Sequence, residues 1–223
     1  MGLFDLFKKK KSGPMYLYSE QELKELDEFI GKEFGRFENV FHEIASPDIH
    51  LDVCICEPKD KPYIALVTMG AGAFSMPIPE QWKKYDIDRA EYVIYIPKNW
   101  NWNSSAMEDY WPIKVLKDTA RLPIMCGTWL SFGHTLQADE AGSPYASNTR
   151  LNSVVLDFVD KDDSPVRIKT SSGKIINFYE VIPLYPEELE FKMNSDAEQL
   201  LEKFNEQDIA YRPVNPQRKS AIL

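Results

Sequence analysis

Hydrophobic and polar residues alternate along residues 46–58, SPDIHLDVCICEP. One register of this segment forms an apolar stripe, made of Ile49, Leu51, Val53 and Ile55. The other register holds four residues of metal-binding type, His50, Asp52, Cys54 and Cys56. Alternate residues on one face of a strand lie ~6.6 Å apart, too far for neighbouring ligands around zinc with ~2.3 Å bonds. The pattern therefore favours a strand buried on both faces, with cysteine as a small hydrophobe, over a metal site.

Other extended segments lie between turn residues, and each predicts a strand. With the segment above, they are residues 40–44, 49–57, 63–69, 92–96, 128–134, 154–159, 166–170 and 175–182. The sequence TSSGKI at residues 170–175 is typical of a turn, so it predicts a hairpin between the last two strands.

Three capping boxes, each a serine followed three residues later by a glutamate, predict helix starts. They are Ser19/Glu22, Ser105/Glu108 and Ser195/Glu198. We expect Pro123 to end the second helix. About eight strands and three or four helices without regular alternation predict an α+β fold. In that fold the helices pack on a mixed, mainly antiparallel sheet.

The chain has 223 residues, of which 43% are hydrophobic and 13% aromatic, enough for the core of one globular unit. We expect a basic and apolar N-terminal segment (1–13), one domain (14–210) and an irregular tail (211–223). Three cysteines cannot all pair, no secretory signal is visible, and no stretch reaches the ~20 apolar residues of a membrane span. These features predict a cytoplasmic protein.

The formal net charge is −9, although residues 1–13 (MGLFDLFKKKKSG) carry a local charge of +3. An acidic body repels phosphates, which disfavours nucleic-acid binding, and it suits docking to a basic protein. The N-terminal segment is typical of a solvated terminus; the alternative is a short helix that lies on a membrane surface.

Few residues are grouped in a way that suits catalysis or cofactor binding. Cys126 and His134 would form a nucleophile pair only if the fold brought them together. Gly70 and Gly72 follow a predicted strand, but Ser75 stands where a dinucleotide-binding motif has its third glycine, so we expect a plain loop. We therefore predict no catalytic residue, no metal site and no cofactor.

The most aromatic stretch is PKNWNWNSSAMEDYWP at residues 97–112. Its aromatic side chains either pack a helix onto the sheet or anchor a partner, because Trp and Tyr dominate binding hot spots. Trp102, flanked by two asparagines, is the side chain we expect to be most exposed. The predicted partner-binding residues are Trp100, Trp102, Asp109 and Tyr110, with Asp86, Asp88 and Glu91 as charges that steer the partner.

Six motifs occur in a fixed order over roughly residues 40–192: SPDIHLDVCICEP, PYIALVTMGAGAFSMPIP, AEYVIYIPKNW, YWPIKVLKDTARLP, FGHTL and VIPLYPEELEFK. Together they resemble the suppressor of fused domain family. The residues that match the family motifs are Asp52, Thr68, Gly70, Met76, Pro77, Trp111, Pro112, Lys117, Arg121, Gly133, His134 and Thr135.

This resemblance implies a non-enzymatic binding protein. Animal members sequester a transcription factor and use a further C-terminal lobe, which has no counterpart in this sequence. Bacterial members of this length are associated with immunity proteins that neutralise cognate toxins. The resemblance therefore implies a protein partner, with a basic toxin domain as the expected one. The alternative is a metal- or thiol-dependent enzyme that uses His134 with Cys126, or the His50 group.

Overall fold

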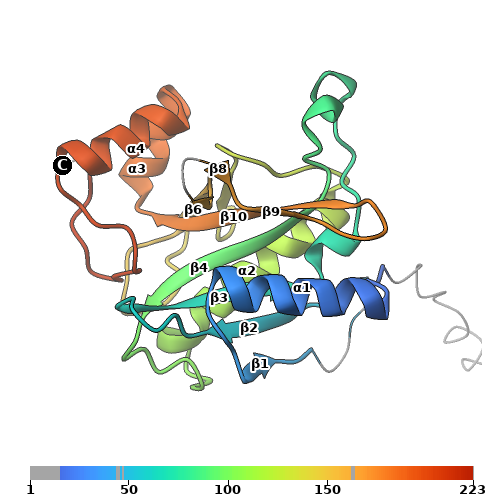
Figure 1. Cartoon of the computed structure of the whole chain (residues 1–223). Coiled ribbons are helices and arrows are strands. Elements are labelled where there is room, and N and C mark those ends of the chain that lie inside the picture. The colour runs from blue at the N-terminus through green and yellow to red at the C-terminus, as the bar shows by residue number, and fades with distance from the viewer. Residues whose placement is uncertain (1–15, 44–45, 47, 162–163, 223) are drawn as a thin grey trace, which may run out of the picture.

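The computed structural model describes residues 16–43, 46, 48–161 and 164–222. The predicted N-terminal segment (1–13), with its membrane-surface alternative, lies outside the described residues. One eight-stranded sheet runs through the molecule in the order β1-β2-β3-β4-β10-β6-β5, with β9 paired to β10 (Figure 1). The strands are β1 (Asn39–Phe41), β2 (Asp52–Cys56), β3 (Tyr63–Met69), β4 (Ala90–Pro97), β5 (Thr135–Gln137), β6 (Ser153–Phe158), β9 (Arg167–Lys169) and β10 (Ile175–Leu184).

Four α-helices and three further short elements surround this sheet. The helices are α1 (Glu20–Glu33), α2 (Met107–Cys126), α3 (Pro186–Asn194) and α4 (Ala197–Glu206). The short elements are the 3₁₀-helices η2 (Ala71–Ala73) and η3 (Glu80–Tyr85), and the ribbon of β7 (Asp160–Lys161) with β8 (Ser164–Pro165). Only β10 and β4 pair in parallel among the named strands. The α+β prediction, with a mixed and mainly antiparallel sheet, is confirmed.

The segment with two registers, residues 46–58, supplies β2, which is buried on both faces. Val53 and Ile55 pack in the core beneath α2, where Trp111 and Leu116 belong to the same cluster. Cys54 and its neighbour Cys56 pack in the opposite core, beneath α1. Burial raises the pKa of both thiols. The strand interpretation is confirmed, because each face of β2 meets a helix.

The capping boxes locate three helix starts, one at the predicted residue and two one residue further along the chain. At Ser19 the hydroxyl accepts from the Glu22 backbone N–H at 3.3 Å, and the Glu22 carboxylate accepts from the Ser19 N–H at 2.9 Å. The second helix is capped at Ala106, and α4 is capped by Asp196. The helix α3 has no counterpart among the predicted elements. At α4, Asp196 competes with Ser195 as the cap, so the spacing of a capping box is ambiguous there by one residue.

The prediction that Pro123 ends the second helix is wrong. Both Pro112 and Pro123 lie inside α2, which ends at Cys126 where Gly127 adopts the left-handed conformation (φ 57°). A proline leaves the carbonyl four residues earlier without its helical donor. At Pro112 that carbonyl belongs to Glu108, and it accepts instead from the Asn148 side-chain amide at 3.1 Å. A tertiary hydrogen bond thus offsets part of the cost of an interior proline.

Most predicted strands are present, including the hairpin, in which Ile175 pairs with Lys169. The exception is the predicted strand 128–134, which is a loop followed by the short β5. Gly133 in this loop has φ 77°, a conformation that ends extended structure and suits glycine. The loop places Trp129, Ser131 and His134 beside the sheet rather than in it.

The C-terminal tail (211–223) has no helix or strand among its described residues, yet it is packed against the domain. The Val214 N–H donates to the Tyr95 carbonyl at 2.7 Å. Arg218 lies between the rings of Tyr185 and Phe204, with its guanidinium carbon 4.8 Å from each ring centre. None of the described helices is both long and apolar enough to span a membrane.

Candidate functional site

The glycine loop at residues 70–73 holds an anion, and that anion is a side chain of the protein. Its backbone N–H groups at Gly70, Ala71 and Gly72 donate to the Glu91 carboxylate at 2.9, 3.2 and 3.1 Å. The Thr68 and Tyr18 hydroxyls donate to the same carboxylate at 2.6 and 2.8 Å. Successive backbone N–H groups commonly form such anion-binding nests. The loop therefore anchors β4 internally, and its family-motif residues Thr68 and Gly70 are scaffold.

The expectation that Glu91 acts as a steering charge is wrong, because its side chain is fully buried. Burial raises the pKa of this carboxyl, and the hydrogen bonds from its donors oppose that effect. The other two predicted steering residues lie at the surface. Asp86 is exposed at the end of η3 with φ 54°, and half-buried Asp88 accepts from the Ser75 hydroxyl at 2.5 Å.

The predicted aromatic anchors are half-buried and pack against their neighbours. The Trp100 indole N–H donates to the Asp109 carbonyl at 2.8 Å. Trp102 packs edge-on against Phe41, with ring centres 6.0 Å apart, and Tyr110 packs against the same ring. Trp102 is thus not the freely exposed side chain we expected. A partner-binding role for these residues stays a prediction.

Asp52 and its two histidines form a small cluster at the end of β2. Its carboxylate lies 3.1 Å from His42 Nδ1 and 3.3 Å from His50 Nε2. Nearby, the Arg121 guanidinium pairs with Glu43 and lies 3.4 Å from Asp48. Within the described part of the chain, no group of three or more His, Cys, Asp or Glu side chains is arranged to hold a metal ion.

The remaining family-motif residues divide between core and surface. Trp111 is fully buried and stacks on Tyr145 with ring centres 5.4 Å apart, while the buried Met76 sulfur accepts from the Leu130 N–H at 3.4 Å. Pro112 is buried in α2, Lys117 is half-buried and Pro77 is exposed. These residues mainly shape the core, whereas Gly133, His134 and Thr135 lead to a pocket.

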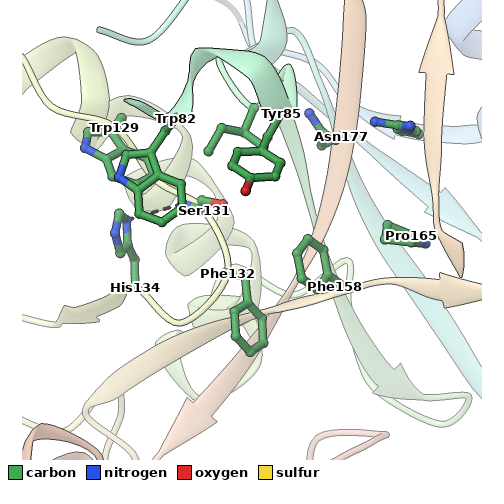
Figure 2. A pocket seen from close by; sticks show the side chains of 11 residues that line it. Trp82, Tyr85, Trp129, Ser131, Phe132, His134, Phe158, Pro165 and Asn177 are labelled. Carbon is green, nitrogen blue, oxygen red and sulfur yellow. Dashed lines mark hydrogen bonds between the residues drawn. The ribbon is translucent and has the colours of Figure 1, made fainter. Parts of the chain in front are cut away.

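This pocket has a volume of about 500 Å³ and is lined largely by aromatic side chains (Figure 2). It lies between η3, the loop before β5 and the strands β6, β9 and β10. Aromatic side chains form most of its wall, and polar groups are few. The lining residues are Trp82, Tyr85, Ile87, Trp129, Ser131, Phe132, His134, Phe158, Pro165, Arg167 and Asn177. Pockets of this size and composition are typical of ligand and anchor sites.

Stacked aromatic side chains form one part of the pocket lining, and exposed aromatic side chains form its entrance. Phe132 stacks on Phe158 with ring centres 5.0 Å apart, and Phe158 packs in turn against Tyr179. At the entrance, Trp82 is 43% exposed and Tyr85 is 49% exposed. Both side chains line the same apolar pocket, and exposed apolar patches of this kind mark interaction sites. These two residues are therefore the clearest candidates for contact with another molecule.

His134 lies on the pocket wall in its neutral form. Its ring packs edge-on against Trp129, with centres 4.5 Å apart, and its Nδ1 accepts from the Ser131 N–H at 3.3 Å. Burial lowers the pKa of His134, so the imidazole is uncharged at neutral pH. The Cys126 thiol is exposed at the end of α2, and it makes no hydrogen bond with His134 in the described part of the chain.

The sequence missed most of this site. Only His134 had been singled out, through its family motif. The usable signal was the segment PEQWKKYD at residues 79–86, in which Trp82 and Tyr85 stand among charged residues. Two aromatic residues three apart in a polar segment are unlike a core strand or helix, which would surround them with apolar neighbours.

The solved structures that superpose on this fold include three suppressor of fused structures. A suppressor of fused homolog from Neisseria gonorrhoeae superposes with a TM-score of 0.59 at 16% identity, over 91% of this chain and 97% of that chain. The structure of a Sufu–Fu complex gives 0.61 at 14% identity, over 89% and 91%. Drosophila Suppressor of Fused gives 0.56 at 13% identity, over 90% of this chain and 50% of that one.

The family assignment rests on the sequence. The family model of the suppressor of fused protein (SUFU) matches residues 47–219. The chain therefore belongs to the suppressor of fused family, as the order of its motifs indicated. Among curated protein sequences, none matches the chain.

Proposed function

We propose that this chain is a cytoplasmic, non-enzymatic protein-binding module, and that it acts as an immunity protein that neutralises a cognate toxin. The observation that supports this function most is the exposed aromatic entrance of the pocket, formed by Trp82 and Tyr85. A similar structure is that of a Sufu–Fu complex, in which a relative assembles with another protein. The toxin role rests on the resemblance to bacterial family members.

The mechanism we propose is steric. The stacked rings of Phe132 and Phe158 hold the pocket in shape. The protein therefore loses little conformational freedom of its own when a partner side chain enters. The surrounding surface would then cover the toxin's active site. A net charge of −9 favours encounter with a basic toxin from a distance, because opposite fields raise association rates. Asp86 and Asp88 contribute to that field close to the pocket.

Co-expression with the product of the adjacent gene tests this function. We expect the wild-type chain to restore growth and to form a complex of equal stoichiometry with the toxin. The double variant Trp82→Ala/Tyr85→Ala should fold but lose protection. Leu23→Ala is the matched control, since it removes an apolar side chain that is 39% exposed on α1. Growth arrest that persists with the wild-type chain, without a complex, would refute the immunity role.

A further inference from the structure

The pocket is not acidic, although the protein is. Its lining includes the cation Arg167 and the neutral His134 but no carboxylate. Arg167 is exposed on β9, and no salt bridge joins it to another of the described residues. The guanidinium at this pocket therefore has its hydrogen-bonding capacity free for a ligand.

The fold fixes where this guanidinium is attached. Arg167 pairs with Asn177 across β9 and β10, and Asn177 pairs with Ala90 at the start of β4. The Asn177 side-chain amide donates to the Asp86 and Arg89 carbonyls at 2.8 and 3.1 Å, which ties this row of the sheet to the end of η3. The cation and the aromatic entrance are therefore held on one rigid frame.

Two further cations lie close to the aromatic walls. The Lys84 ammonium lies 4.9 Å from the centre of the Tyr85 ring. Burial lowers the pKa of His134, and the charge of Lys192 on α3 lowers it further. Arg167 is thus the cation of the lining itself, and Lys84 stands beside the aromatic entrance, while the carboxylates of Asp86 and Asp88 lie outside the lining.

We propose that the pocket binds a short segment of a partner protein in which a large apolar or aromatic side chain stands next to a carboxylate. The apolar side chain enters between Trp82, Tyr85 and Phe158, and the carboxylate pairs with Arg167. Arginine suits this role because its planar fork binds a carboxylate through two parallel hydrogen bonds. This inference rests on the proposed protein-binding function and adds the chemistry of the bound segment.

Panning of a library of random short peptides on the full chain tests this inference. Peptides that also bind the Trp82→Ala variant are removed first, so that the selected ones depend on the pocket. That variant should fold normally, since Trp82 is 43% exposed, and circular dichroism checks this point. We expect enrichment of an aromatic or large aliphatic residue next to Asp, Glu or the terminal carboxylate.

Affinity measurements on a selected peptide then isolate the role of the cation. Replacing its carboxylate by the amide should weaken binding about tenfold, as should Arg167→Gln in the protein, and combining both changes should add little more. Lys98→Gln is the control with the same change of charge. Lys98 follows the end of β4, whereas Ala90, at its start, lies in the same row of paired residues as Asn177 and Arg167. The two ends of the strand are about 26 Å apart.

The results separate this inference from the function on which it rests. Enrichment of basic segments, no enrichment that depends on Trp82, or equal affinity for the carboxylate and amide peptides would each overturn the inference. Toxin neutralisation can survive all three of these results, because a toxin can contact Trp82 and Tyr85 with a folded surface instead of a short acidic segment. Conversely, a selected acidic peptide combined with failure to neutralise the toxin would leave the pocket chemistry standing and refute the immunity role.

Discussion

Replacement of Glu91 by glutamine tests how the glycine loop is anchored. Glutamine keeps the size of the side chain but has one acceptor oxygen instead of two. If the amide oxygen takes the position of Oε1, it retains the donors at Tyr18, Gly70 and Gly72. The amide nitrogen then faces the Ala71 N–H, which loses its acceptor in a fully buried place.

The expected loss of stability follows from these contacts. A buried donor without an acceptor costs about 1–3 kcal/mol, and hydrogen bonds to a charged acceptor are worth about 1 kcal/mol more than neutral ones. We therefore expect Glu91→Gln to lower the free energy of unfolding by about 3 kcal/mol, after allowing for the smaller desolvation cost of a neutral amide. With an m-value of about 3 kcal/mol/M, the urea midpoint falls by about 1 M.

Urea denaturation at pH 8, followed by tryptophan fluorescence, measures this effect. The control is Glu80→Gln, which makes the same chemical change in a side chain that is 86% exposed and whose single ion pair among the described residues is with Lys83. That control should stay within about 0.5 kcal/mol of the wild type. If Glu91→Gln unfolds at the same urea concentration as the control, the carboxylate is not the anchor of the loop and this account of the fold fails.

Three further predictions concern stability. Hydrogen-bond donors outweigh burial at Glu22 and lower its pKa to about 2. Its contribution to folding stability, up to ~3 kcal/mol, is therefore present above about pH 5 and is lost as the pH falls towards 2. The difference in unfolding free energy between wild type and Glu22→Gln should close over that range. Gly70→Ala should abolish stable folding in thermal melts, because its Cβ would lie 1.9 Å from a backbone oxygen. Arg218→Met should cost about 3–5 kcal/mol in urea denaturation, since it leaves the buried Glu188 carboxylate unpaired, whereas the exposed Lys219→Met should cost little.

Local sequence signals succeeded where the structure-forming interaction is itself local. The Ser19 capping box lies within four residues and was predicted correctly, as was the hairpin at residues 170–175. Prediction failed where distant residues decide the outcome. The helix α2 continues through Pro112 with the help of Asn148, which is 40 residues away from the carbonyl it satisfies. No pattern within the helix reveals that donor.

The candidate site shows the same division. The order of motifs was sufficient to place the chain in its family, and extended apolar segments identified most of the strands, although residues 128–134 form a loop. Glu91 and Asp86 nevertheless look alike in the sequence, and only the fold shows that one carboxylate is enclosed by five donors while the other is at the surface. Likewise, nothing along the chain indicates that Trp82 and Arg167 line one pocket.

The amino-acid sequence by itself determined the class of fold, the buried strands and the family, because periodicity and ordered motifs are properties of neighbouring residues. The tertiary structure decided which charges are buried and which aromatic side chains meet around a pocket. Those outcomes depend on contacts between segments that lie far apart along the chain, and such contacts arise only when the sheet and its helices pack together.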